Sequence, residues 1–205
     1  MTSVRLYPDS CREYKAWHDY MHNSKESAII NLSEITYGTF FDKWDSKKRN
    51  LYRQSLKHGY QSRELSWPER NQYIDDIQTI NTSKIMRQGR MMNQAYLERP
   101  KEIIGRRTCE FHYGSFIGCI GNDGYLRAYI TTNFCGELAA ASQIIGHGNF
   151  LSYGIMVNLW YEFVRICIIR KIKVIVYSRW NDGFDGLKFW KKSVGMRPEV
   201  LIENI

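Results

Sequence analysis

The chain has 205 residues, of which 43% are hydrophobic and 24% are charged, a composition typical of a folded globular protein and not of a disordered one. No run of about eighteen apolar residues exists, which argues against a membrane span, and the opening MTSVRLYPDS lacks the apolar core of a signal peptide. The five cysteines have no CxxC spacing, so we expect buried thiols in the cytoplasm and no disulfide or zinc framework.

The formal charge of +8 is concentrated in the first half of the chain. Residues 1–107 hold 19 Lys and Arg against 13 Asp and Glu, whereas residues 108–205 hold 10 against 8. This asymmetry suggests a polyanionic partner for the basic half, and the alternative is a solvated surface that keeps the protein soluble. We predict a basic, mainly helical portion over 1–107 that packs on the sheet of a second portion, 108–205; one continuous domain is the alternative.

The first 45 residues carry few signals. His18 and His22 lie four apart in a segment that favours a helix, where they would share one face. A third ligand and the HExxH glutamate are both missing, so we expect no metal site and interpret the two histidines as a surface or core pair. The segment SAIINLSEITYGTFFDKW then predicts a strand followed by a turn at Gly38.

The most basic stretch, KKRNLYRQSLKHGYQSR at 47–63, predicts a helix that ends at Gly59. Tyrosines alternate with its cations, and such a mixture can bind a phosphate backbone and stack on bases. A further helix with an N-cap at Ser66 is predicted to end near Gly89, where a second basic group gathers. The candidates for binding nucleic acid or the acceptor are Arg49, Arg53, Lys57, Arg87 and Arg90, with a solvated surface as the alternative.

The second half of the chain predicts a mixed sheet. GNDG at 121–124 separates two strand-like runs and is suited to a hairpin turn. A third strand, GELAAASQII, leads through the loop GHGNFLSYG into the helix IMVNLWYEFVRICI, the strand KVIVYS and the final helix DGLKFWKKSVG. A helix between two strands implies a parallel crossover, so the fold class is α+β with helices flanking one mixed sheet, and MRPEVLIENI adds an edge strand.

This order of elements resembles the GNAT superfamily of N-acetyltransferases over about residues 108–205, and DGLKFWKKSVGMRP is similar to its final helix and turn. The segments YRQSLKHGYQSR and INTSKIMRQGRMMNQAY resemble parts of FemAB-type aminoacyl ligases, which contain GNAT-like domains. The resemblance implies a GNAT-like fold and an acyltransferase. The donor would be acetyl-CoA or another acyl-CoA, or an aminoacyl-tRNA, and the acceptor an amine such as that of a nucleic-acid base or an amino sugar.

Two positions depart from the GNAT pattern. The pyrophosphate loop of that superfamily reads Gln/Arg-x-x-Gly-x-Gly/Ala, whereas this chain has IGHGNFLSYGIM, with its glycines spaced differently. Many members carry a tyrosine on the last helix that protonates the departing thiolate, whereas Phe189 and Trp190 stand here and have no phenolic proton. These departures favour the alternative function, a non-catalytic nucleic-acid-binding module on a degenerate GNAT-like scaffold.

Acyl transfer requires that the donor be held and that the developing oxyanion be stabilised. Main-chain N–H groups from Gly148 to Gly154, at the start of a helix, would hold a donor phosphate; the alternative is that these glycines only permit a tight turn. The resemblance also implies that the two parallel strands splay and expose a backbone N–H near Ile145. The candidates for binding the cofactor are Ile145, Gly146, Gly148, Asn149, Ser152, Tyr153, Gly154 and Asn181.

The reaction also needs a base for the amine, and four residues are candidates. His147 has a side chain suited to proton transfer and follows the third strand, and Glu137 at the start of that strand would act through water. Tyr177 and Ser178 end the neighbouring parallel strand, where open α/β sheets bind ligands. A surface histidine, a solvated carboxylate and a core tyrosine are the structural alternatives. The sequence contains no Ser-His-Asp elbow and no Walker loop, which disfavours a hydrolase or an NTPase.

Overall fold

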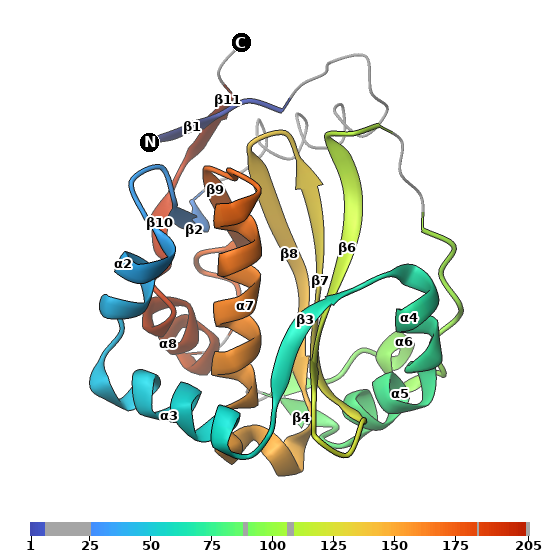
Figure 1. The fold of residues 1–205 in the computed structure, drawn as a ribbon. Helices are drawn as coiled ribbons and strands as arrows, with labels where there is room; N and C mark the ends of the chain where they lie inside the picture. The colour runs from blue at the N-terminus through green and yellow to red at the C-terminus, as the bar shows by residue number, and fades with distance from the viewer. Residues whose placement is uncertain (7–25, 88–89, 106–108, 184, 204–205) are drawn as a thin grey trace.

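The computed structural model describes residues 1–6, 26–87, 90–105, 109–183 and 185–203 (Figure 1). Within these residues a seven-stranded sheet has the order β10-β2-β9-β8-β7-β6-β3. Within this seven-stranded sheet only β8 and β9 pair in parallel, which confirms the predicted α+β class with a mixed sheet. Its strands are β2 Ser27–Asn31, β3 Gln61–Leu65, β6 His112–Ile120, β7 Leu126–Cys135, β8 Leu138–Gly146, β9 Val174–Arg179 and β10 Arg197–Glu199.

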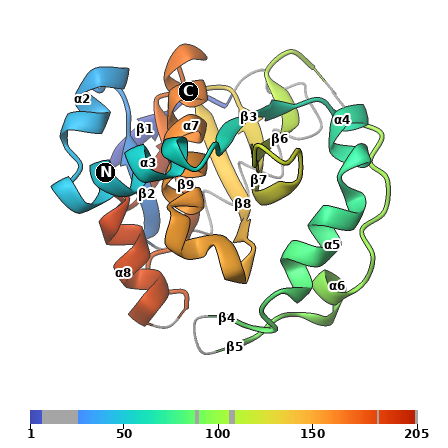
Figure 2. The same ribbon diagram turned by 60° about the horizontal axis from the view of Figure 1, so that its bottom comes forward.

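Two short ladders accompany this sheet. Strand β1 (Thr2–Val4) pairs in parallel with β11 (Leu201–Glu203), and together they cover part of one face through a cluster that includes Val4 and Leu201. Strand β4 (Met86–Arg87) pairs with β5 (Arg90–Met91) as a small hairpin. Figure 2 shows this hairpin next to the end of β8, with α8 (Asp185–Ser193) across from it.

Helices cover both faces of the sheet. The helices α2 (Tyr37–Asp42), α3 (Ser46–Lys57), α7 (Ile155–Ile169) and α8 lie over one face, and α4 (Trp67–Gln72), α5 (Ile74–Thr82) and α6 (Gln94–Leu97) lie on the other. Alternate residues of the central strands point to the two layers, because Ile117 packs with α7 whereas its neighbour Phe116 packs with Ile77 and Ile80 of α5.

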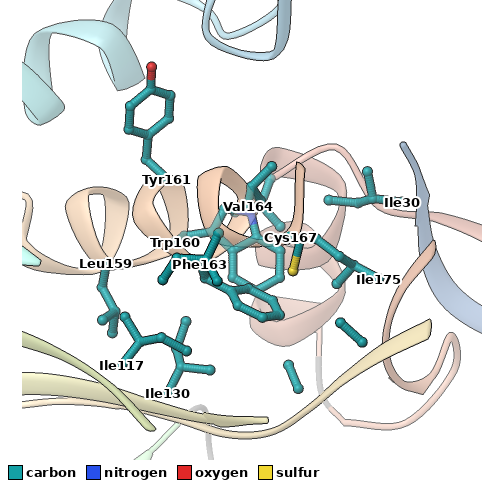
Figure 3. Close-up of a cluster of buried hydrophobic side chains, with 14 of the residues drawn as sticks. Ile30, Ile117, Ile130, Leu159, Trp160, Tyr161, Phe163, Val164, Cys167 and Ile175 are labelled. Carbon is teal, nitrogen blue, oxygen red and sulfur yellow. The ribbon is translucent and has the colours of Figure 1, made fainter. Parts of the chain in front are cut away.

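Helix α7 forms the centre of the largest hydrophobic cluster (Figure 3). Its buried residues include four in succession, 158–161, so the helix is buried around most of its circumference. Tyr161 packs against Phe40 of α2, and the opposite side of the helix packs on the sheet. Trp160 and Phe163 are almost wholly buried there, and their rings meet edge to face with centroids 5.3 Å apart. The side chains that surround them include Ile30, Ile117, Ile130, Leu159, Val164, Cys167 and Ile175.

Most elements of the second half lie where the sequence predicted them. The hairpin of β6 and β7 turns through Gly124, whose φ of 81° requires a glycine-like conformation, and β10 pairs with β2 at the edge of the sheet. The described cysteines include three buried thiols, at 119, 135 and 167, as expected. Burial raises the pKa of Cys119 to about 12.

Two predictions for the first half need correction, and a third is confirmed. Gly38 lies inside α2 and not in a turn, because Thr36 caps that helix and exchanges hydrogen bonds with Thr39 in a capping box. The helix predicted to end at Gly59 is confirmed as α3, which ends at Lys57 just before Gly59 with its φ of 80°, and the strand β3 that follows pairs with β6. The predicted helix after Ser66 is divided into α4 and α5 at Tyr73.

The two portions of the chain contribute to one sheet, since β2 and β3 precede residue 107 and pair with strands that follow it. None of the helices in the described ranges is long and apolar enough to cross a membrane. His18 and His22 lie outside the described residues, as does Gly89. Elsewhere in the described part of the chain, no three His, Cys, Asp or Glu side chains gather in a way that could hold a metal ion.

Candidate active site

The parallel strands β8 and β9 separate after a short paired segment. They pair at Leu138↔Val174, Ala139↔Ile175 and Ala140↔Val176, and no later pair is formed although β8 continues to Gly146. On the other side of β8, Ala141 and Gln143 face consecutive residues of β7, so Ser142 is an extra, bulged residue. A bulge increases the local twist of a strand. The splay that the resemblance implied is therefore present.

The bulge also decides which main-chain groups face the splay. The His147 N–H donates to the Arg127 carbonyl across the ladder with β7, at 2.8 Å. Hydrogen-bonded pairs alternate in an antiparallel ladder, so Ile145 bonds to β7 as His147 does, whereas Ile144 and Gly146 turn their N–H and C=O groups to the opposite edge. The N–H group that faces the splay is thus that of Ile144, one residue before the predicted Ile145.

A cavity of about 540 Å³ fills this splay. It lies within the usual size range for small-molecule sites. Most of its walls are apolar or aromatic, two cations contribute, and among the described residues no Asp or Glu lines it. The lining comes from β8, β9, α6, α7, α8, η1 (Gly148–Tyr153) and the β4–β5 hairpin with its flanks. Its residues are Lys84, Arg87, Met91, Met92, Asn93, Tyr96, Ser142, Gln143, Ile144, Ile145, Gly146, Leu151, Met156, Tyr177, Leu187 and Trp190.

The loop between β8 and α7 uses its amides within the protein. The Gly148 N–H donates to Ser83 Oγ at 2.8 Å, the Asn149 N–H to His147 Nδ1 at 3.2 Å, and the Phe150 N–H to the His147 carbonyl at 3.0 Å. These amides are therefore not available to a phosphate, and the predicted anion-binding loop is wrong at these positions.

The last glycine of this loop has a structural role. Gly154 has a φ of 77°, and a Cβ built there would lie 2.3 Å from the carbonyl oxygen of Leu51 in α3. Ser152 is exposed and Tyr153 packs its ring edge to face against His58, at 4.8 Å between centroids. Neither residue lines the cavity, so the alternative interpretation of the loop as a tight turn accounts for it better.

Two of the catalytic candidates lie apart from the cavity. His147 is largely buried at the start of η1, where its Nδ1 accepts the Asn149 N–H, and it is not part of the lining. Burial lowers its pKa, and the positive charges of Arg127 and Arg87 lower it further. Glu137 lies at the paired end of β8 and forms an ion pair of 2.7 Å with Lys173. Its carboxylate also accepts a hydrogen bond from the Arg5 N–H, so Glu137 stabilises the paired end of β8.

The candidates at the end of β9 have different surroundings. Tyr177 lines the cavity and meets Trp190 edge to face with centroids 5.6 Å apart. Ser178 has a φ of 50° and its hydroxyl donates to the Arg179 carbonyl, at 3.3 Å. Asn181 lies in a separate depression of about 430 Å³ with Glu26, Arg179 and Asp182. Of these three candidates, the structure brings only Tyr177 to the cavity.

A buried lysine fixes the segment after Tyr177. Lys191 of α8 is wholly buried, and its ammonium group donates to the carbonyls of Arg179 at 2.6 Å and Asp182 at 3.1 Å. The same nitrogen lies 5.9 Å from the centroid of the Tyr177 ring. Hydrogen bonds from a charged donor are among the stronger ones, so this lysine holds the end of β9 against α8 and helps to position Tyr177.

The basic candidates separate into two places. Arg49 and Arg53 lie on α3, where their guanidinium groups donate to the Asp42 carbonyl at 3.0 Å and to Asn50 Oδ1 at 3.2 Å, and Lys57 on the same helix is exposed. Arg87 instead lines the cavity, and the Arg90 side chain lies outside the described residues. Sequence reasoning missed Lys84, which precedes β4, and Tyr96, which lies in α6, because only the fold brings the segments that flank the β4–β5 hairpin to the end of β8.

No protein-family model matches the chain, and no curated protein sequence matches it. Solved structures do match. FemX has a TM-score of 0.61 at 9% identity, over 85% of this chain and 59% of that chain. L-PGS from Bacillus licheniformis has a TM-score of 0.51 at 14% identity, over 81% and 49%. A tandem GNAT protein from the clavulanic acid biosynthesis pathway has a TM-score of 0.50 at 10% identity, over 95% and 59%.

These structures share the fold of the chain. The predicted GNAT-like fold is confirmed, as is its likeness to the FemAB type, since FemX is among the matches. The chain spans between 49% and 59% of the length of the three matched structures.

Proposed function

We propose that the protein transfers an acyl or aminoacyl group to an amine and that the reaction takes place in the cavity between β8 and β9. The observation that carries the proposal is the end of strand pairing after Ala140↔Val176, which leaves the main chain of Ile144 facing a cavity of about 540 Å³. The shared fold with FemX and with a tandem GNAT protein supports the same reaction class.

The cavity provides groups for two steps of such a transfer. The donor carbonyl enters the splay, and the Ile144 N–H donates a hydrogen bond to the oxyanion that forms when the amine attacks. The bond from the carbonyl carbon to the thiolate or ribose oxygen then breaks; the departing group takes a proton and the attacking nitrogen loses one, so the two proton transfers balance. The described lining holds two phenols, Tyr96 and Tyr177, and a phenol can donate one. Either tyrosine would take the role of the tyrosine that is missing at Phe189 and Trp190.

The donor is an acyl-CoA or an aminoacyl-tRNA. The FemAB resemblance implies the second, whereas the matched tandem GNAT protein, whose structure is of a form without AcCoA, favours the first. A transfer assay separates them: acetyl-CoA, longer acyl-CoAs and a set of aminoacyl-tRNAs are each incubated with amino sugars, amino acids and nucleosides, and thiol release or deacylation is measured. Donor consumption that depends on both protein and acceptor is the expected result, and silence from every donor would refute the proposed reaction.

A matched pair of variants connects the activity to the cavity. Ile144→Trp places a large ring in the splay and is expected to lower transfer roughly a hundredfold, because small displacements of reacting groups are costly. Ile169→Trp makes the same change at a residue that is 63% exposed on α7 and should leave the rate unchanged. Thermal unfolding verifies that both variants fold. Equal rates for the two variants would contradict the proposed site.

A second candidate function is a nucleic-acid-binding module without catalysis. It is favoured by the loop amides at Gly148, Asn149 and Phe150, which are occupied within the protein. A gel shift on DNA and RNA over a salt series tests it, because phosphate contacts give a steep salt dependence. Replacing Arg49, Arg53 and Lys57 by Ala should flatten that dependence, and a slope equal to that of the unaltered protein would rule out a role for α3.

A further inference from the structure

Two cations border the open edge of β8. Lys84 is exposed, Arg87 is half-buried, and both line the cavity. Within the described ranges neither of them forms an ion pair, and no described Asp or Glu lines the cavity to balance their charge. Lys84 is solvated, whereas the guanidinium group of Arg87 is partly withdrawn from water, and a nearby anion would offset the cost of that burial.

Arg87 is held in place by neutral partners. One terminal nitrogen donates to the Gly146 carbonyl at 2.9 Å, and the other donates to the Ile80 carbonyl at 2.7 Å. These bonds join the end of α5 to the open edge of β8 and fix the guanidinium group there. Main-chain carbonyls carry no net charge, so they leave the net positive charge of the guanidinium group uncancelled. Burial lowers the pKa of Arg87, which also makes an anionic ligand favourable at this position.

The segment that carries these two cations also binds the first amide of the loop between β8 and α7. Ser83 lies directly before Lys84, and its hydroxyl accepts the Gly148 N–H. That amide is the first of those that the sequence predicted to bind phosphate. The segment Ser83–Arg87 thus occupies one anion-binding group of the loop and brings two side-chain cations to the cavity next to it.

We propose that Lys84 and Arg87 form a phosphate-binding subsite of this cavity, in place of the amides of the loop at 148–154. This inference rests on the proposed function, and it implies that the acyl donor carries a phosphate group. Its phosphate is either the diphosphate of coenzyme A or the phosphodiester at the acceptor end of a tRNA, while the apolar walls from Met91, Met156 and Trp190 accept apolar parts of the donor.

Isothermal titration calorimetry with three probes tests the subsite: inorganic pyrophosphate, coenzyme A and deacylated tRNA. Lys84→Glu should weaken binding at least about tenfold, which corresponds to about 1.4 kcal/mol, because it removes a charged hydrogen-bond donor and adds a charge that repels the phosphate. Lys84→Arg retains the charge and should bind within about twofold of the unaltered protein. Lys101→Glu makes the same charge reversal at an exposed residue outside the cavity and should have no effect.

The outcomes separate the two proposals. Loss of coenzyme A binding alone in Lys84→Glu identifies the diphosphate, and loss of tRNA binding alone identifies the phosphodiester. Weaker pyrophosphate binding in Lys84→Glu, in a protein that transfers no acyl group, supports the subsite and refutes the proposed function. Equal affinities for Lys84→Glu and the unaltered protein, or no binding of any probe, overturn the subsite even where transfer is observed.

Discussion

The two ends of β8 are stabilised by different means, although they belong to one strand. At its start, Leu138 and Ala139 are wholly buried and pair with strands on both sides, and the neighbouring Glu137 is bound to Lys173. At its far end only β7 pairs with it, and the opposite edge faces the cavity and the guanidinium group of Arg87.

The two ends of β8 therefore have different roles in the protein. The start of β8 contributes to stability through apolar burial and two ladders. The far end gives up one ladder, so its shape depends on long-range contacts made by Ser83, Arg87 and Gly154. Sites that bind ligands need such unpaired but positioned backbone. Three predictions test the division, in order of decreasing expected effect.

The largest effect is expected at the paired end. Leu138→Ala removes a wholly buried side chain and should lower the free energy of unfolding by about 2–5 kcal/mol. Ile144→Ala truncates a half-buried side chain in the cavity wall and should lower it by about 1 kcal/mol or less. Urea denaturation of both variants measures the difference. Equal losses would mean that the open end is as much a part of the core as the paired end.

An intermediate effect is expected where the open end is held by a single hydroxyl. Ser83→Ala leaves the Gly148 N–H without its acceptor, and such a loss costs about 1–3 kcal/mol when the group is buried. Ser193→Ala removes a hydroxyl that only donates to the Trp190 carbonyl in its own helix, and should cost less than about 0.5 kcal/mol. Chemical denaturation compares the pair, and a Ser83→Ala variant as stable as Ser193→Ala would show that the loop does not depend on this bond.

The smallest effect concerns pH. Because burial and two nearby arginines lower the pKa of His147, the unfolded chain binds a proton at a higher pH than the folded one does. His147 therefore contributes stability above its unfolded pKa of about 6.5, and this contribution is lost as the pH falls below that value. His147→Gln should show a flatter loss of stability between pH 7 and pH 5 in urea titrations. Parallel curves for the two proteins would exclude the contribution of His147.

Local signals predicted the elements of the second half. The residues of GNDG demand a turn by their own conformational preferences, and the long apolar segment 155–169 favours a buried helix. The order of strands and helices then restricts the topology, since a parallel pair needs a crossover. The GNAT-like fold and the splay follow from these features together.

The local sequence does not predict the contacts that shape the site. The bond from Gly148 to Ser83 joins residues 65 apart in the chain, and the bond from Arg87 to Gly146 joins residues 59 apart. Nothing in the local sequence of the loop indicates that its amides are already satisfied. The bulge at Ser142 likewise shifts the exposed N–H from Ile145 to Ile144, because one extra residue reverses the direction of every main-chain group that follows.

The position of β2 has a consequence for synthesis on the ribosome. This strand lies between β9 and β10, and both partners follow residue 173, so β2 leaves the ribosome long before either of them exists. Its Ala28 and Ile29 are wholly buried in the folded protein. An apolar strand whose partner strands are synthesised late is exposed to aggregation and is bound by chaperones. We therefore expect nascent chains that stop before β9 to aggregate unless chaperones bind them.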